Sequence, residues 1–371
     1  MKKIRRALLS VSDKTALIAL ARALSSQEIE MVSTGGTASF LRDCGFEVID
    51  VASLTGHAEA FGGRVKTLSF EIAAALLFDR ERDQAEADNL GIVPVDLLVC
   101  NLYPFKQAAK ANAEDKELIE QIDIGGVTLI RAAAKNSSSV SVLVSPADYE
   151  SFILELNAND GKISPETRRE LMRKAFNHTA DYDSAIAAEL DRRAGQKSLR
   201  KAFNRGQSLR YGENPHQQAE IYYQTDTALP FTLHQGKELS YTNLLDLYAA
   251  VTAANTATSK EGTCACAIVK HGNPCGLAVA ESAALAFNHA WAGDPVSAFG
   301  SVIAFNCEVT EETVKQFRLN DPDRGRRRFI EIVAAPSFAA GTREMLSALA
   351  SLRMVEWNGG IMVEPIFGMT L

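Results

Sequence analysis

Short apolar runs alternate with segments of helical spacing through the first half of the chain. Apolar and β-branched runs predict strands at residues 7–12, 30–33, 47–51, 96–101 and 139–144. Apolar positions that recur every three or four residues predict helices between them, such as 15–25. Because strands that alternate with helices pair in parallel, this half predicts an α/β fold with a doubly wound parallel sheet.

A long charged and alanine-rich stretch separates this half from the next. Residues 164–193 predict two long helices that close the first domain, and residues 194–198 predict a linker. A second α/β pattern follows, with strands predicted at 265–270, 301–305 and 330–334 and helices at 244–254 and 283–292. The 371 residues suffice for two domains, which we place at 1–197 and 198–371.

Composition narrows the classes of function. The chain has 39 Lys and Arg against 46 Asp and Glu, a net charge of -7, and so offers no overall basic surface for nucleic acid. No apolar run approaches the roughly 18–20 residues that span a bilayer, so no membrane role is predicted. The six scattered cysteines, without a secretory signal, predict reduced thiols in the cytoplasm, most of them small buried side chains.

Two polar segments follow the first two predicted strands and predict a phosphate cradle. Its residues are Ser10, Ser12, Lys14, Thr34, Gly35, Gly36 and Thr37. Glycines, hydroxyls, a helix N-terminus and a lysine all favour an anion, and carboxyl ends of parallel strands meet at one edge. Capping of the following helix by residues 33–37 is the alternative interpretation.

Further charged and phenolic side chains leave other predicted strand and helix ends. Arg64 and Lys66 follow a glycine pair and would suit a phosphate or carbonyl ligand, although solvated surface cations are the alternative. Tyr103 follows an apolar strand, while Asp123 and Lys135 stand near the two ends of a predicted helix. A carboxylate beside cations can act as a general base, whereas Asp123 as a helix N-cap is the alternative.

These residues carry a resemblance to a known family. Six motifs stand in the order and rough spacing of the IMP cyclohydrolase domain of bifunctional AICAR transformylase/IMP cyclohydrolases: SVSDK at 10–14, STGGT at 33–37, GGRVKTL at 62–68, NLYPF at 101–105, IDIGG at 122–126 and RAAAKN at 131–136. Residues 209–217, 269–276, 297–300 and 330–336 resemble the beginning of the AICAR transformylase domain.

The resemblance implies a methylglyoxal-synthase-like first domain that closes the ring of FAICAR to give IMP. By this resemblance Lys66 polarises the formyl oxygen, Asp123 accepts a carboxamide proton, and Lys135 and Tyr103 assist proton transfer and loss of water. The implied nucleotide-binding residues are Ser10, Ser12, Lys14, Thr34, Gly35, Gly36, Thr37, Arg64, Thr67, Asn101, Gly125 and Gly126. No metal and no tightly bound cofactor is implied.

The resemblance further implies a partial, cytidine-deaminase-like second domain that transfers a formyl group from 10-formyltetrahydrofolate to AICAR, in a homodimer. Lys270 and His271 match the catalytic pair, although a satisfied strand-end histidine is the alternative for His271. The substrate-binding residues implied here are Arg210, Tyr211, Asn273, Gly300 and Glu331. A zinc deaminase is excluded by spacing, because Pro274-Cys275 would need a cysteine where Ala278 stands. Cys264 and Cys266 read as strand alternation with one face inward, typical of core.

The chain also departs from this family. Residues 69–75 read SFEIAAA where family members have His-Pro and a later histidine, and Ser137 replaces another histidine. The match fades after residue 360 and the chain stops at Leu371, so we expect a shortened second domain with weak or absent transformylase activity. Two alternatives are a nucleotide-phosphate-binding module without catalysis and an incomplete gene model.

Overall fold

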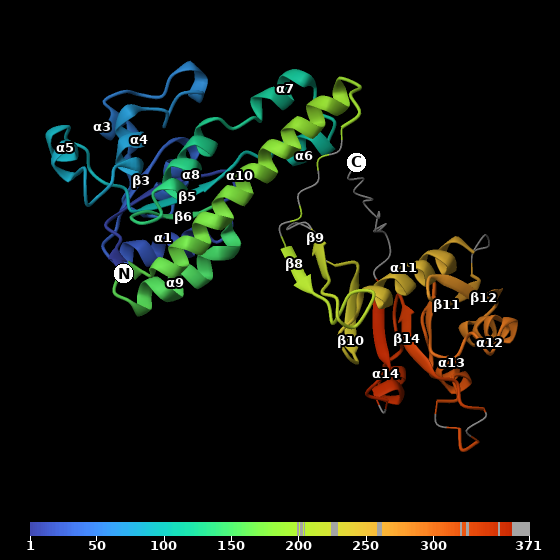
Figure 1. The fold of residues 1–371 in the computed structure, drawn as a ribbon. Helices are drawn as coiled ribbons and strands as arrows, with labels where there is room; N and C mark the ends of the chain where they lie inside the picture. The colour runs from blue at the N-terminus through green and yellow to red at the C-terminus, as the bar shows by residue number, and fades with distance from the viewer. Residues whose placement is uncertain are drawn as a thin grey trace. The chain divides into compact units, whose positions relative to one another are not determined.

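The chain forms two compact units, residues 1–202 and 203–371 (Figure 1). The computed structural model describes residues 1–198, 200, 203, 205–223, 229–257, 262–319, 321–323, 326–347 and 349–357. Among the described residues, none of the helices combines the length and the apolar composition that a membrane-spanning segment requires.

The first unit is built on a five-stranded parallel sheet with the order β4-β3-β2-β5-β6. Its strands are β2 (Arg6–Val11), β3 (Glu30–Ser33), β4 (Ile49–Asp50), β5 (Leu97–Asn101) and β6 (Ser141–Leu143). The chain runs outward from β2 to β4 and then returns to the other side of β2 with β5, so the β2–β5 pair is the topological switch point of the sheet. The predicted parallel α/β sheet is confirmed.

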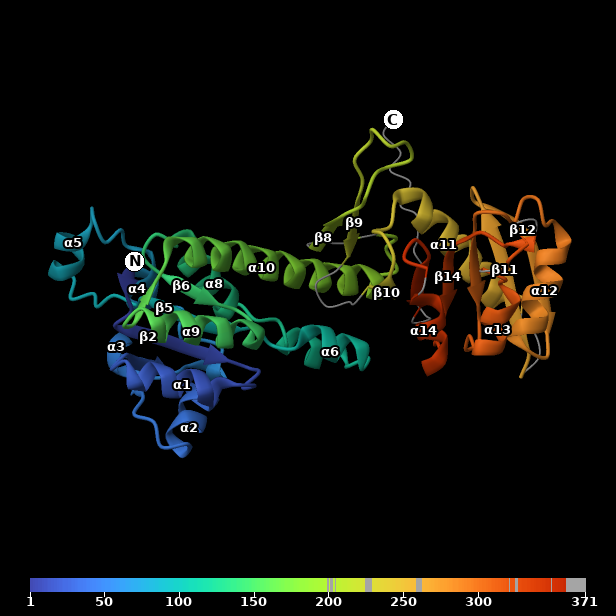
Figure 2. The ribbon, with the colours of Figure 1, turned by 90° about the horizontal axis from the view of Figure 1, so that it is seen from below.

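Helices cover both faces of this sheet. They are α1 (Leu17–Ser26), α2 (Gly35–Asp43), α3 (Val51–Thr55), α4 (Phe70–Leu77), α5 (Gln84–Asn89), α6 (Phe105–Lys110), α7 (Asp115–Glu120), α8 (Gly125–Lys135), α9 (Tyr149–Ala158) and α10 (Pro165–Arg193). Figure 2 shows α1 and α2 on one side of the sheet and α8 and α10 on the other. A short antiparallel pair, β1 (Lys2–Lys3) with β7 (Lys162–Ile163), lies beside them.

The prediction of two helices over residues 164–193 is wrong, because α10 is one continuous helix of 29 residues. Ser164 caps it by accepting a hydrogen bond from the Thr167 backbone N–H at 3.2 Å, and Pro165 occupies the first helical position. No glycine and no further proline interrupts the segment, so nothing in the backbone ends the helix before Arg193.

The second unit holds a mixed six-stranded sheet with the order β10-β15-β14-β13-β11-β12. Its strands are β10 (Phe231–Gln235), β11 (Cys264–Lys270), β12 (Asn273–Ala280), β13 (Ser301–Phe305), β14 (Ile330–Ala335) and β15 (Arg353–Trp357). A separate two-stranded pair is formed by β8 (Arg205–Ser208) and β9 (Glu220–Tyr223). Strand β12 was not predicted from the sequence, because Pro274 and Gly276 are atypical of a central strand, although both are tolerated at this edge.

Both faces of this second sheet are buried under helices. The helices are α11 (Tyr241–Thr256), α12 (Ala283–Gly293), α13 (Glu311–Gln316) and α14 (Ala340–Ser347). Leu247 and Val251 of α11 pack with Ala267 on one face, whereas Phe287 of α12 packs with Cys266 on the other. Neighbouring residues of β11 therefore point to opposite cores, as strand geometry requires.

Candidate active site

A pocket of about 710 Å³ opens in the first unit at the carboxyl edge of the parallel sheet, where β2 and β5 end. Open α/β sheets bind their ligands at such a switch point. The predicted site residues that line it are Ser10, Ser12, Lys14, Thr34, Gly36, Thr37, Arg64, Lys66, Thr67, Asn101, Tyr103, Asp123, Gly125 and Gly126. Segments far apart in the sequence therefore meet at one place.

Asn101, the last residue of β5, organises the loop that follows β2. Its Oδ1 accepts hydrogen bonds from the backbone N–H groups of Ser12 at 2.7 Å and Asp13 at 2.9 Å. Its Nδ2 donates to the Asp13 carbonyl at 2.9 Å. Because most of its hydrogen-bonding capacity is used within the protein, Asn101 shapes the pocket more than it offers itself to a ligand.

Thr37 holds the end of β2 from the opposite side. Its Oγ1 donates to the Val11 carbonyl at 3.0 Å and accepts from the Val11 backbone N–H at 3.1 Å. Thr34, at the N-cap position of α2, makes no capping hydrogen bond with its side chain. Thr34 therefore does not cap α2 with its side chain. The N-terminus of α2, with its first backbone N–H groups, is an end of the helix that favours an anion.

The loop before α4 brings a carboxylate onto Lys66. Ala60 and Val65 form an antiparallel bridge, exchanging backbone hydrogen bonds of 3.0 and 3.3 Å, so the flanking Glu59 and Lys66 stand side by side. The Lys66 Nζ lies 3.1 Å from the Glu59 Oε2. Gly35 has a φ of 54°, which favours a glycine at the start of α2, although Gly35 itself does not line the pocket.

A second cation of the pocket is also paired. Arg64 forms an ion pair with Glu120 at the end of α7, with the Arg64 Nε 3.3 Å from the Glu120 Oε2. Both side chains are exposed, and exposed ion pairs contribute little free energy. An incoming anion could therefore replace Glu120 as the partner of Arg64 at a small cost in free energy. Lys14, the third cation, lies with its Nζ 5.8 Å from the centre of the Phe40 ring.

Asp123 stands at the N-terminus of α8 and faces the pocket. Its Oδ1 accepts a hydrogen bond from the Gly126 backbone N–H at 2.7 Å, so the predicted capping contact and the position in the pocket coexist. Burial raises the pKa of the Asp123 carboxyl group, and hydrogen bonds from the backbone of Gly126 and Tyr103 partly oppose this rise. A carboxylate whose pKa is raised towards neutrality is a better proton acceptor than an ordinary surface aspartate.

Three functional residues escaped the sequence analysis: Glu59, Glu120 and Tyr182. The Tyr182 hydroxyl, on α10, accepts from the Asp123 backbone N–H at 2.9 Å and donates to the Gln121 carbonyl at 2.8 Å. Burial raises the pKa of Tyr182 to about 12, so the phenol stays protonated and keeps this role. Each of the three acts through contacts between segments that are distant in the sequence or folded into a loop, which no local pattern reveals.

Lys135 is not brought together with the other predicted catalytic residues. It is the exposed last residue of α8, whereas Gly125 at the other end of the helix lines the pocket. At about 1.5 Å per residue, the eleven-residue helix separates the two ends by roughly 15 Å. Its catalytic role stays a prediction that this pocket does not support.

Residues 69–75, where the sequence departs from the family that it resembles, form the start of helix α4. Ser69 caps α4, because its Oγ accepts a hydrogen bond from the Ile72 backbone N–H at 3.2 Å. Leu68, just before it, still lines the pocket. The different sequence of residues 69–75 therefore changes the side chains that follow Leu68, while Lys66, Thr67 and Leu68 still line the pocket.

We expect Gly126→Ala to distort the site. An added Cβ would lie 2.7 Å from the Asp123 Oδ2 and 2.8 Å from the Leu102 Cδ2, closer than side chains tolerate. Overpacking of this kind costs about 1–3 kcal/mol in the free energy of unfolding. Urea unfolding followed by circular dichroism measures the loss. Gly36→Ala, where a Cβ meets nothing within 4 Å, is the matched control; equal losses for both variants would contradict the prediction.

In the second unit, Lys270 and His271 lie at a tight turn between β11 and β12. His271 and Gly272 both have positive φ angles, 53° and 75°, as a two-residue hairpin turn requires. Asp246 of α11 accepts hydrogen bonds from their backbone N–H groups at 3.3 and 2.5 Å. The Lys270 Nζ donates to the Phe299 carbonyl at 2.7 Å, next to Gly300, and Asn273 donates to the His271 carbonyl at 3.0 Å.

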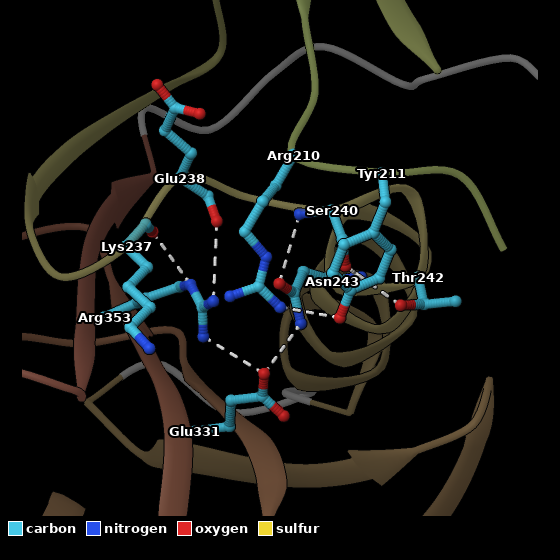
Figure 3. A network of polar contacts seen from close by, with 9 residues as sticks. All are labelled: Arg210, Tyr211, Lys237, Glu238, Ser240, Thr242, Asn243, Glu331 and Arg353. Atoms are coloured by element: carbon cyan, nitrogen blue, oxygen red, sulfur yellow. Dashed lines mark hydrogen bonds and ion pairs between the residues drawn. The ribbon is translucent and has the colours of Figure 1, made fainter. Parts of the chain in front are cut away.

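The other predicted residues of this unit join a polar network around the buried Arg353 (Figure 3). The Glu331 Oε1 lies 3.0 Å from the Arg353 Nη1 and accepts from the Asn243 Nδ2 at 3.2 Å. Arg210 stacks 4.5 Å over the Tyr211 ring and donates to its hydroxyl at 2.6 Å. Asn243 and Asp246 lie one helical turn apart on α11, so this helix links the network to the Lys270 turn.

The first unit is an α/β fold with a polar, cation-bearing pocket at the switch point of a parallel sheet. The chain belongs to the AICARFT/IMPCHase bienzyme family, whose profile matches residues 133–364, and an MGS-like domain matches residues 16–128. This confirms the resemblance drawn from the motifs. The family carries AICAR formyltransferase and IMP cyclohydrolase activities of purine biosynthesis, with 10-formyltetrahydrofolate as co-substrate.

Two relatives share most of this chain. The bifunctional purine biosynthesis protein PurH of Neisseria meningitidis (strain FAM18) is 42% identical over 375 residues, covering 96% of this chain and 69% of its own length. The protein of the same name from Polynucleobacter necessarius (strain STIR1) is 41% identical over 371 residues, covering 95% of this chain and 69% of its own length. The solved "Crystal structure of ForH" is 34% identical, covers 51% of this chain and all of that chain, and has a TM-score of 0.45.

Proposed function

We propose that the first unit is an IMP cyclohydrolase domain that closes the ring of FAICAR in the pocket at the β2–β5 edge. The observation that carries this proposal is the meeting of Lys66 and Asp123 in one pocket with Lys14, Arg64 and the N-terminus of α2. The cations and the helix N-terminus suit the nucleotide phosphate, while Asp123 and Lys66 suit the reacting carboxamide and formyl groups.

The proposed reaction is intramolecular. The carboxamide nitrogen attacks the formyl carbon as Asp123 accepts a proton from that nitrogen, and Lys66 stabilises the charge that develops on the formyl oxygen. Tyr103 assists the departure of this oxygen as water, which leaves the purine ring of IMP. Because both reacting groups belong to one substrate, holding them in contact supplies a large part of the rate enhancement.

We propose that the second unit belongs to a cytidine-deaminase-like transformylase domain, predicted over residues 198–371, and that it binds AICAR and folate. Lys270 and His271 would act on the amine and formyl groups, and the Arg210, Tyr211 and Glu331 network would hold AICAR near Asn273 and Gly300. We further propose that this chain transfers the formyl group only weakly. We also propose that the protein forms a homodimer and is located in the cytoplasm.

The test is a spectrophotometric assay of the purified chain with FAICAR, following IMP. We expect formation of IMP well above the uncatalysed rate, and little turnover with AICAR and 10-formyltetrahydrofolate. Tight binding of FAICAR with no increase in rate would replace the proposal by the nucleotide-phosphate-binding alternative. Robust formyl transfer would show that the second unit is competent as it stands.

We expect Glu59→Gln to lower kcat for IMP formation about tenfold with little change in KM, because Glu59 holds Lys66 in place and does not itself line the pocket. Glu120→Gln is the matched control: it releases Arg64, a phosphate-binding cation, and should leave kcat unchanged while KM stays equal or falls. Steady-state kinetics of both variants separates the two roles. A larger effect on KM than on kcat for Glu59→Gln would contradict a positioning role.

A further inference from the structure

Two half-buried cysteines of the second unit lie near each other: Cys264 begins β11, and Cys307 follows the end of β13 by two residues. Strands β11 and β13 are antiparallel, with Cys266 opposite Phe305, and the Asn306 backbone N–H extends the pairing by donating to the Ala265 carbonyl at 3.3 Å. Continuing the same register by one residue places Cys264 opposite Cys307. Both thiols are partly accessible to solvent.

The type of pairing at this position suits a disulfide. The Asn306 backbone N–H donates to the Ala265 carbonyl, while the Ala265 N–H donates to the Asn306 side-chain Oδ1 at 2.7 Å, so the ladder ends here. Because the pairs alternate along an antiparallel ladder, continuing it past this point gives Cys264 and Cys307 the place of a non-hydrogen-bonded pair. Cα atoms in such pairs are about 4.5 Å apart with their side chains close together. This separation falls inside the range of about 4.4–6.8 Å that a disulfide spans.

The surroundings of the two thiols distinguish them from Cys44 and Cys266. Both pack against the core that holds Cys266. The thiols of Cys264 and Cys307 interact, and burial together with this contact raises the pKa of Cys307. Cys266 is fully buried, whereas Cys44 is exposed in the first unit, so neither offers both access and a facing partner.

We propose that Cys264 and Cys307 form an oxidation site that takes a low-molecular-weight disulfide as its substrate. One thiolate attacks the small disulfide and releases one small thiol, leaving a mixed disulfide on the protein. The second thiolate then attacks that bond, forms the Cys264–Cys307 disulfide and releases the second small thiol. The two protein thiols lose two protons and two electrons, and the small disulfide gains them.

The disulfide would stabilise the second unit and would not obstruct the proposed transformylase site. Cys264 begins β11 and Lys270 ends it, so at about 3.3 Å per residue the oxidised pair lies roughly 20 Å from the His271 turn. A disulfide between the start of β11 and the segment just after β13 limits the conformations of the unfolded chain and therefore stabilises the second unit. The inference does not depend on the proposed function.

The experiment treats the full chain with oxidised glutathione at pH 8.5 and maps alkylated peptides by mass spectrometry. We expect a peptide pair joining Cys264 and Cys307 with a mass loss of about 2 Da, and a raised Tm for the oxidised protein. The ratio of this linked product to mixed disulfide should fall about tenfold or more when the chain is unfolded in urea, because the fold holds the second thiol in place.

Single Cys→Ser variants test which thiols form the disulfide. Cys264→Ser and Cys307→Ser should each abolish the linked product and leave a mixed disulfide on the remaining thiol. Cys275→Ser, which removes another half-buried cysteine of the same unit, should leave the linked product unchanged. Stable mixed disulfides at both positions of the folded wild-type chain, or a link that forms equally well in urea, would overturn the inference.

Discussion

Replacing Asp123 by asparagine is expected to lower kcat for IMP formation by about 10²–10⁴-fold, the usual contribution of a positioned general base. Asparagine has nearly the same shape and can still accept the hydrogen bond from the Gly126 backbone N–H, but it cannot take a proton from the carboxamide. KM should change little, since in the proposed binding mode Lys14, Arg64 and the N-terminus of α2 hold the phosphate. The FAICAR assay measures both constants.

The stability of the same variant distinguishes catalysis from folding. Burial raises the pKa of Asp123, so this group contributes stability below its unfolded pKa and loses it as pH rises through the folded pKa. At neutral pH the buried charge is therefore a cost, and Asp123→Asn should unfold at an equal or higher Tm. Asp123→Ala also removes the capping contact and should lose about 1 kcal/mol. A marked fall in Tm for the asparagine variant would contradict this account.

The pH profile follows from the same shift. A base works only when deprotonated, so kcat should fall as pH drops through the raised pKa of Asp123, at a higher pH than for an ordinary aspartate. The acid limb should be absent from the residual activity of Asp123→Asn. A limb that persists in the variant would assign the titration to another group.

The central strands were predictable because each carries a strong local signal. Residues 97–101 of β5 and 264–270 of β11 are apolar runs that end in polar residues, and both were predicted within a few positions. In contrast, β12 contains Pro274 and Gly276, which make sense only once the strand is known to lie at an edge. The continuous α10 was predicted as two helices although it contains no residue that would break it.

The site was predictable as a set of residues but not as a geometry. Parallel strands align their carboxyl ends, so Ser12 and Asn101 could be expected at one edge. The pairing of Lys66 with Glu59 depends on the Ala60–Val65 bridge, and the hold of Tyr182 on Asp123 depends on the docking of α10. Lys135 is a different case: its motif matches, but the length of α8 places it outside the lining of this pocket, and its role stays a prediction.

Lys66→Ala is expected to lower kcat by about 10²–10³-fold, the effect of removing one preorganised donor from a developing oxyanion. Stability should change little, because the Glu59 pair that is lost lies near the surface, where ion pairs contribute about 0–1 kcal/mol. Lys110→Ala, at the exposed last residue of α6, is the matched control and should keep full activity.

The double variant Glu59→Gln, Lys66→Ala shows whether the effects of the two residues on kcat are coupled. If Glu59 works only by positioning the Lys66 ammonium group, its removal has no further effect once that group is gone, so the double variant should match Lys66→Ala. Independent roles would instead multiply the two losses in kcat. Additive free energies of activation would therefore show that Glu59 reaches the substrate by another route, although the 3.1 Å contact joins it to Lys66 in the free protein.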